Sequence, residues 1–120
     1  MNYNIKGTGL EVTDELRTYI EKRLAHSEKF INGDTSAHVD VELEHAAARE
    51  GERFRAEYTL QCAHHVYRAS EWGSTLHEAI DLAGGELTKE LRRNKRKRLH
   101  MLRHSAVRVK EYLRGWRTKV

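Results

Sequence analysis

The sequence predicts an α+β fold in which two helices cover one face of a four-stranded mixed sheet, followed by a helical C-terminal extension. Three observations predict it. Apolar and polar residues alternate in three consecutive segments after residue 37, which is the pattern of half-buried strands. Two other segments repeat apolar residues every three or four positions, as amphipathic helices do. The 120 residues, 38% hydrophobic and 33% charged, are enough for one domain with one core.

A short strand and the first helix are expected at the N-terminus. Residues 3–6 alternate apolar and polar and stop at Gly7, which predicts a strand and a turn. Thr13 is the expected N-cap of a helix whose first turn is acidic. Residues 32–34 (Asn-Gly-Asp) break the chain after this helix. Its apolar stripe consists of Leu16, Tyr19, Ile20 and Leu24.

Three further strands are predicted at residues 38–44, 53–62 and 66–70, joined by a polar connection over 46–52 and a tight turn at 63–65. We expect them to form an antiparallel meander. The first strand reaches the second through a helix, so these two should pair in parallel by a right-handed crossover. The predicted inward-facing residues are Val39, Val41, Leu43, Phe54, Ala56, Tyr58, Leu60, Cys62, Tyr67 and Ala69.

The second helix is predicted to begin after a cap at Ser74 or Thr75. Small residues at Gly84 and Gly85 would let it lie close to the sheet, although each glycine costs about 1 kcal/mol of helix stability relative to alanine. The resulting element order is β-α-β-β-β-α. The apolar stripe of this helix consists of Leu76, Ile80, Ala83, Leu87 and Leu91.

Positive charge is concentrated at the C-terminal end. Residues 86–120 hold 13 of the 22 Lys and Arg residues but three of the 18 Asp and Glu residues. Such an uneven distribution of charge along the chain is typical of a polyanion-binding protein. With the core stripe set at Leu87 and Leu91, a helical wheel directs five basic side chains to solvent, where they would contact nucleic-acid phosphates. These residues are Lys89, Arg92, Arg93, Arg96 and Lys97.

Other chemistry is disfavoured. His100 and His104 are one helical turn apart but lack a third metal ligand nearby. Four carboxylates on the polar strand faces, those of Asp40, Glu42, Glu44 and Glu57, follow strand alternation rather than the spacing of a nuclease metal site. No glycine-rich phosphate loop is present. We therefore expect no enzyme activity, no catalytic residues, no metal and no cofactor.

The protein is expected in the cytoplasm and away from membranes. Cys62, the one cysteine, is expected to be a buried structural thiol that forms no internal disulfide, which agrees with a reducing compartment. No apolar run approaches the roughly 18–20 residues of a membrane span.

The chain is expected to divide into a domain of residues 1–98 and a basic amphipathic helical tail of residues 99–120. If the second helix is unbroken, the tail projects and needs a partner, which could be a second copy, another protein or RNA. Alternatively, Ser105 starts a separate helix, Gly115 ends it, and the tail folds back on the domain. The apolar stripe of the tail consists of Leu99, Leu102, Ala106, Val109, Leu113 and Trp116.

Across about residues 1–98 the chain resembles the ribosome hibernation promoting factor and protein Y family. The resemblance is carried by IKG and LEVTDELRTYIEKRL (5–7 and 10–24), RASEWG (68–73), and LHEAID with LTKELRRNK (76–81 and 87–95). The order and spacing of these stretches make it specific. The chain resembles the short form of the family, because it has no room for the C-terminal dimerisation domain of long members, and its basic tail is unusual.

The resemblance implies the same β-α-β-β-β-α fold, similar to double-stranded RNA-binding domains. It also implies binding to rRNA of the small ribosomal subunit, in the cleft for mRNA and tRNA, which keeps ribosomes inactive under stress. The implied RNA-binding residues are the five basic residues of the second helix together with Lys22 and Arg23 of the first. The alternative function is a general double-stranded RNA-binding module.

Overall fold

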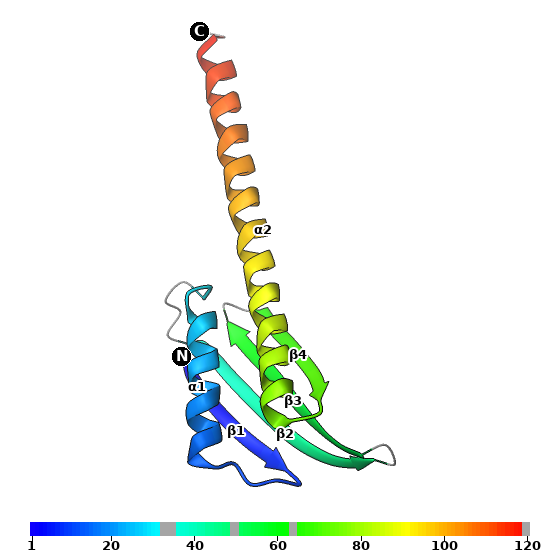
Figure 1. Cartoon of the computed structure of the whole chain (residues 1–120). Coiled ribbons are helices and arrows are strands. Elements are labelled where there is room, and N and C mark those ends of the chain that lie inside the picture. The colour runs from blue at the N-terminus through cyan, green and yellow to red at the C-terminus, as the bar shows by residue number, and fades with distance from the viewer. Residues whose placement is uncertain (32–35, 49–50, 63–64, 119–120) are drawn as a thin grey trace.

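The chain folds in the order β1–α1–β2–β3–β4–α2 (Figure 1), which confirms the predicted element order and fold class. This computed structural model describes the backbone of residues 1–31, 36–48, 51–62 and 65–118, and the side chains of 1–31, 36–47, 53–62 and 65–97. The predicted break at 32–34 and the turn residues 63 and 64 lie outside the described residues. The elements are β1 (Asn2–Thr8), α1 (Asp14–Glu28), β2 (His38–Ala48), β3 (Gly51–Cys62), β4 (His65–Gly73) and α2 (Leu76–Thr118).

The sheet has the strand order β1-β2-β3-β4. β1 is parallel to β2, with Ile5 beside Val41, and the other two pairs are antiparallel, as predicted. The predicted polar connection over 46–52 is wrong, because β2 continues to Ala48 and β3 begins at Gly51. A strand ladder is made by backbone groups, so it continues past the point where apolar alternation ends.

Both helices begin at threonine caps. The Thr13 hydroxyl oxygen accepts a hydrogen bond from the Leu16 amide at 3.2 Å, which confirms the predicted cap of α1. For α2 the structure selects Thr75, whose hydroxyl oxygen accepts from the Glu78 amide at 3.1 Å. Each cap satisfies an amide that has no partner within its helix.

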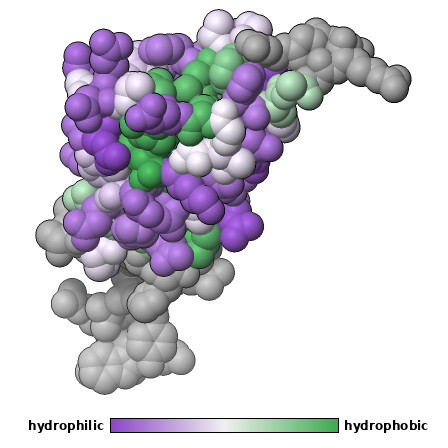
Figure 2. Space-filling model, turned by 90° about the horizontal axis from the view of Figure 1, so that it is seen from below, coloured by the Kyte–Doolittle hydropathy of each residue, from purple (hydrophilic) through white to green (hydrophobic). Residues whose placement is uncertain are grey.

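The core lies between the sheet and the two helices, which cover the same face (Figure 1). The inward-facing strand residues are those predicted, except that Phe54 and Tyr67 are half-buried. Tyr58 is fully buried and its hydroxyl donates to the Ile80 carbonyl oxygen at 3.3 Å. Seen from the end where the helices begin, an apolar strip is framed by hydrophilic side chains (Figure 2).

The other face of the sheet carries paired charges. Arg55 forms ion pairs with Glu57 and, at 3.4 Å, with Glu44, while Asp40 lies 2.9 Å from the His38 ring. These carboxylates are therefore engaged by cross-strand and neighbouring partners, as is typical of a solvated sheet face.

Helix α2 continues without interruption through positions 105 and 115 and projects beyond the sheet (Figure 1), so it neither restarts at Ser105 nor folds back. Its last core residue is Leu91. The projection gives the molecule extents of 76 × 30 × 19 Å. The predicted boundary at residue 98 coincides with no break in the helix, and the predicted apolar stripe from Leu99 to Trp116 lies outside the described side chains.

Candidate nucleic-acid interface

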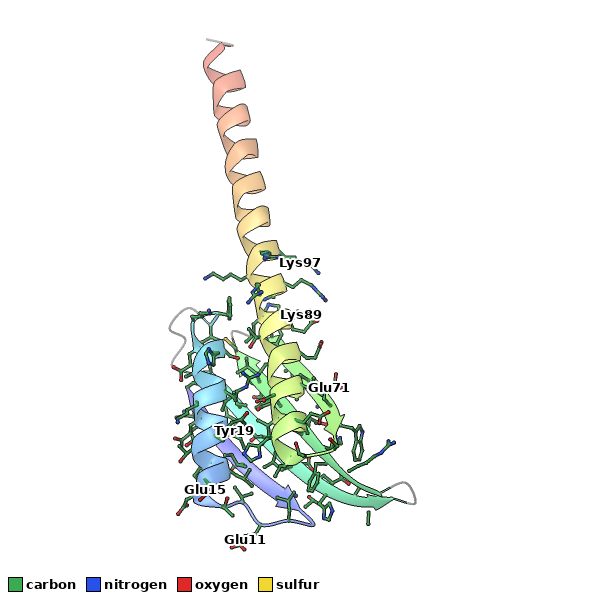
Figure 3. All side chains as sticks on the ribbon, in the orientation of Figure 1. Glu11, Glu15, Tyr19, Glu71, Lys89 and Lys97 are labelled. Atoms are coloured by element: carbon green, nitrogen blue, oxygen red, sulfur yellow. The ribbon has the colours of Figure 1, made fainter. Side chains whose placement is uncertain are left out.

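Basic side chains gather on the outer surface of α2, around and beyond the end of the sheet (Figure 3). All five residues predicted from the helical wheel are exposed. They are exposed because Leu87 and Leu91, on the same helix, are buried in the core and fix its rotation. We call the five residues the cationic ridge: Lys89, Arg92, Arg93, Arg96 and Lys97.

The ridge has a rigid support. Leu91 packs into the core with 3% of its surface exposed. One turn later, Asn94 donates a hydrogen bond from its side-chain amide to the Tyr67 hydroxyl oxygen on β4. The sheet therefore holds the backbone of α2 in place within the ridge, so an anion that binds there needs to order only the side chains.

Two ridge residues have acidic neighbours on the same helix. The ammonium nitrogen of Lys89 lies 3.9 Å from Glu86, and the guanidinium of Arg93 lies 2.9 Å from Glu90. The basic side chains of these pairs are 65% and 58% exposed, and exposed pairs of this kind contribute about 0.3–0.5 kcal/mol. The other three ridge residues form no ion pair with a carboxylate among the described residues, so the ridge keeps its positive field.

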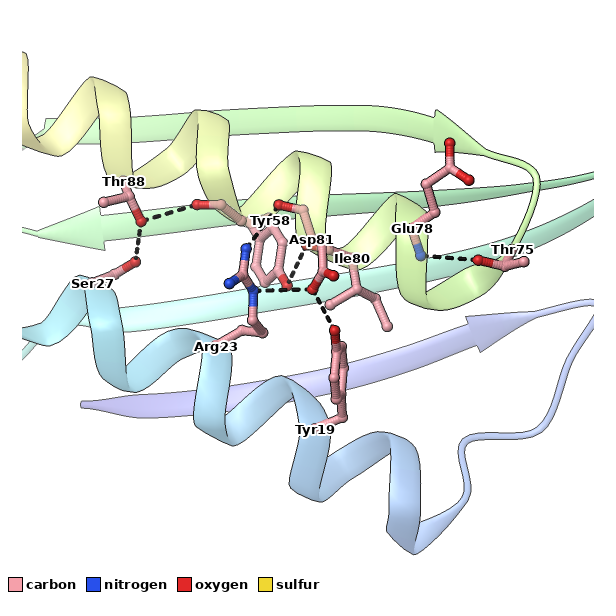
Figure 4. A network of polar contacts seen from close by, with 10 residues as sticks. Tyr19, Arg23, Ser27, Tyr58, Thr75, Glu78, Ile80, Asp81 and Thr88 are labelled. Atoms are coloured by element: carbon pink, nitrogen blue, oxygen red, sulfur yellow. Dashed lines mark hydrogen bonds and ion pairs between the residues drawn. The ribbon is translucent and has the colours of Figure 1, made fainter.

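A polar seam joins α1 to α2 beneath the ridge (Figure 4). Asp81 of α2 accepts a hydrogen bond from the Tyr19 hydroxyl at 2.5 Å and lies 3.1 Å from Arg23 Nε. The bond to Asp81 raises the pKa of Tyr19. Thr88 donates to the Gly84 carbonyl at 3.0 Å, so the buried Ser27 hydroxyl, 3.1 Å away, donates to Thr88. The seam fixes the distance between the helices.

The two predicted residues of α1 lie in different surroundings. Arg23 is half-buried, and its Nη2 also donates to the Asp81 carbonyl oxygen at 3.0 Å. Lys22 is exposed and borders a shallow hollow together with Asp14 and Glu15. The structure therefore brings Arg23, but not Lys22, next to the basic residues of α2.

Arg23 contributes to an inter-helix groove of about 370 Å³, formed where α1 and α2 run side by side. Four basic side chains line it: Arg23 and Lys29 from the α1 side, and Lys89 and Arg92 from α2. Gly84 and Gly85 also line the groove, as do His26 and Thr88.

Sequence reasoning missed Lys29 and His26. Their spacing after Arg23 places them near one face of α1, which was a usable signal. Which face of α1 lies against α2 is decided by packing, however, and the helical wheel of a single helix does not show it.

An aromatic ring lies at the end of α1 among basic side chains. The cationic groups of Lys29, Arg92 and Lys95 lie 5.1, 5.7 and 6.0 Å from the centroid of the Phe30 ring. Cations at such distances are attracted by the ring quadrupole. The ring of Phe30 therefore offsets part of the repulsion between these basic groups, and it too was missed.

Among the described residues, no helix combines the length and apolar character needed to cross a membrane. In the same part of the chain, no three His, Cys, Asp or Glu side chains are grouped as a metal site would require.

Similarity to known proteins covers the domain and its interface. A "ribosome hibernation promotion factor" of Bacillus subtilis is 30% identical over 97 residues, 81% of this chain and 50% of that protein. One from Picosynechococcus is 30% identical over 114 residues, 94% of this chain and 58% of that protein. The chain thus spans about half the length of the curated relatives it matches.

Solved structures share the fold. The N-terminal domain of Thermus thermophilus protein Y aligns with a TM-score of 0.66 and 31% identity, over 78% of this chain and 98% of that domain. A ribosomal subunit interface protein from Coxiella burnetii aligns with a TM-score of 0.68 over 79% of this chain and 98% of that chain, and at 16% identity it shows the fold alone.

The family model described as "Sigma 54 modulation protein / S30EA ribosomal protein" matches residues 3–99. This range contains the sheet except for Asn2, together with α1, the groove and the cationic ridge. The chain therefore belongs to the Sigma 54 modulation protein / S30EA ribosomal protein family.

Proposed function

We propose that this protein is a non-enzymatic, cytoplasmic ribosome hibernation factor. It binds rRNA in the mRNA and tRNA cleft of the small ribosomal subunit and keeps ribosomes inactive under stress. The cationic ridge makes the principal contacts, Arg23 adds a contact from the groove, and Lys22 contributes from the exposed side of α1. Recognition is of phosphates and shape rather than of base sequence.

The observation that carries the proposal is the cationic ridge itself. Five basic side chains stand exposed on one helix that is fixed to a sheet. Helix-surface neighbours lie about 5–6 Å apart, a spacing that lets successive side chains reach successive phosphates of one strand. The relatives are named for the ribosome, and this supports our proposal that rRNA supplies these phosphates.

Charge reversal on the ridge tests the proposal. The variant Arg92→Glu/Arg96→Glu should lose co-sedimentation with small ribosomal subunits, with affinity falling by more than about tenfold, because two attractive contacts become repulsive. The matched control is Arg17→Glu/Arg68→Glu, which makes the same charge change at exposed positions on α1 and β4. The control should co-sediment as the wild type does, and equal binding by both variants would reject the ridge as the contact surface.

A general double-stranded RNA-binding module is the alternative that the β-α-β-β-β-α fold allows. It predicts equal affinity for free duplex RNA and for small subunits in a competition assay. A hibernation factor should prefer the subunit, because the cleft presents a surface of defined shape to the ridge and the groove together.

The part of α2 beyond residue 98 extends past the sheet, and we propose that it makes a further contact with a ribosomal protein, rRNA or a second copy. Sucrose-gradient profiles of ribosomes with the full chain and with a chain ending at Arg98 test this. A shift to paired ribosomes that only the full chain causes indicates a second copy. Weaker binding of the shorter chain without pairing indicates a contact within one ribosome, and identical profiles reject the proposal.

A further inference from the structure

The inter-helix groove differs from the ridge in being concave, and it shares Lys89 and Arg92 with the ridge. Among the residues whose side chains the structure describes, the charged ones that line it are Arg23, Lys29, Lys89 and Arg92, and no carboxylate is among them. Clefts lined by one sign of charge between low-dielectric walls focus the electric field and concentrate counter-ions. Asp81 lies against Arg23 on the side of the seam and offsets part of its positive charge. The positive field in the groove therefore comes mainly from the other three basic residues.

Gly85 gives the groove its open floor. A Cβ atom placed on Gly85 would have no neighbour within 4 Å, so packing does not require a glycine there. Gly84 is more closely surrounded, because a Cβ there would lie in ordinary van der Waals contact, 3.6 Å from Arg23 Nε and 3.7 Å from the Tyr58 hydroxyl. A glycine inside a helix is destabilising relative to alanine. The glycine at position 85 leaves the helix backbone exposed beside four basic side chains.

The volume of the groove limits what it can hold. About 370 Å³ is at the lower end of the roughly 300–1,000 Å³ range of small-molecule sites. A groove of this size has room for one phosphate together with a planar or ring-shaped group. The cations select the phosphate, while Gly85 leaves room for the group attached to it.

We propose that the inter-helix groove binds a single nucleotide, with its phosphate among Lys29, Lys89 and Arg92 and its sugar and base over the exposed backbone of Gly85. This inference rests on the proposed function where the nucleotide belongs to rRNA. The same chemistry would also accept a free mononucleotide, and the experiment distinguishes the two sources.

The test is an NMR titration of amide shifts in the full chain with four probes: uridine 5′-monophosphate, uridine, inorganic phosphate and a hexauridylate RNA. The nucleotide and the RNA should shift the amides of Gly84, Gly85 and Thr88 first. Uridine alone should not shift them, and inorganic phosphate should bind about tenfold more weakly than the nucleotide, because it lacks the contacts of the attached group. Tighter binding of the RNA assigns the site to an RNA strand, and equal binding of the mononucleotide assigns it to a free nucleotide.

Two pairs of variants separate the groove from the ridge. Gly85→Gln fills the open floor and should weaken nucleotide binding by about tenfold, whereas Gly85→Ala covers the backbone with one methyl group and should weaken it by a smaller factor. Lys89→Gln should weaken nucleotide binding by about tenfold through the loss of a charge-assisted contact. Arg93→Gln makes the same charge change outside the groove and should alter nucleotide binding by less than about twofold.

The proposal is overturned if Gly85→Gln binds the nucleotide as the wild type does, or if inorganic phosphate binds as tightly as the nucleotide. Co-sedimentation of the same variants keeps this failure separate from that of the proposed function. If the protein binds small subunits but no nucleotide binds in the groove, the groove site is rejected and the proposed ribosomal function stands. Nucleotide binding in the groove without binding to subunits does the reverse.

Discussion

Asp81 shows how a single side chain can shape the interface through its contacts with neighbouring residues. It accepts from Tyr19 and pairs with Arg23, so one carboxylate draws α1 toward α2 and holds Arg23 at the wall of the groove. Arg23 thus has a structural partner as well as its predicted RNA contact. Lys29 and Arg92 are oriented in a comparable way by the ring of Phe30.

Replacing Asp81 should loosen the seam. Asp81→Asn removes the charge opposite Arg23 and should lower the free energy of unfolding by about 1 kcal/mol, a modest value because both side chains are partly solvated. Urea unfolding measures it. The control is Glu86→Gln on the same helix, whose contact with Lys89 is long and exposed, and which should change stability by less than about 0.5 kcal/mol. Equal losses in the two variants would argue against the seam.

Tyr58 predicts a dependence on alkaline pH. Burial raises the pKa of Tyr58 above its ordinary value of 10.0, so the folded protein keeps this hydroxyl protonated at a pH where the unfolded chain ionises it. Its contribution to stability is complete below about pH 10 and falls as the pH rises above that value. At pH 7 Tyr58→Phe should be less stable than the wild type by about 1 kcal/mol, because it lacks the hydrogen bond to the Ile80 carbonyl oxygen.

The difference between the two proteins should shrink above pH 10, because only the wild type is penalised by ionisation of residue 58 in its unfolded chain. Guanidinium unfolding of both proteins at pH 7 and pH 11 measures this change. A difference that stays constant between these two pH values would contradict the assigned environment of Tyr58.

At the scale of elements, α2 has two roles along its length. Its first half packs on the sheet through the apolar stripe that ends at Leu91. The ridge begins at Lys89, before the stripe has ended, so the last buried turn and the first basic turn overlap. This overlap gives the basic side chains a fixed position, which an isolated basic helix would lack because its like charges repel one another.

The ridge predicts a steep salt dependence of ribosome binding. Each phosphate neutralised adds about 0.7–0.9 to the slope of log affinity against log salt concentration. Arg96→Gln should therefore lower that slope by nearly one unit, measured with small subunits between 50 and 200 mM salt (about the range in which such slopes are determined). Arg68→Gln on β4 should leave the slope unchanged, and an unchanged slope in Arg96→Gln would remove that residue from the contact.

At the scale of the whole molecule, the core and the projecting helix are separable by position. Every residue of the core cluster lies between Ile5 and Leu91, while α2 continues to Thr118. At about 1.5 Å per residue, some 40 Å of helix follows the last core residue. Every described residue of the core cluster therefore lies within the predicted domain of 1–98, while the helix itself is continuous, and the division from a tail of 99–120 stays a prediction.

Truncation tests this division. A chain ending at Arg98 should fold with a free energy of unfolding within about 1 kcal/mol of the full chain, because every described residue of the core cluster is retained. Its radius of gyration should fall well below the 20.2 Å of the full chain. Chemical unfolding and small-angle scattering measure the two quantities. A large loss of stability would show that the tail supports the domain.

The sequence alone determined the element order, the parallel pairing of β1 with β2, the cap at Thr13 and the outward rotation of the ridge. Each follows from short-range periodicity or from a rule of chain connection, and such signals do not need the partner surface. The same periodicity predicted a connection over 46–52 that is too long, because β2 continues to Ala48 and β3 begins at Gly51. Backbone pairing continues where side-chain alternation stops.

Only the tertiary structure decided which faces of α1 and α2 meet. That choice created the groove, brought Lys29 and Phe30 beside Arg92, and left Lys22 on the other side. It also decided that α2 projects rather than folds back. These features depend on contacts between residues far apart in the chain, whose free energies are set by the packing of the whole core and leave no periodic signal in the sequence of either helix.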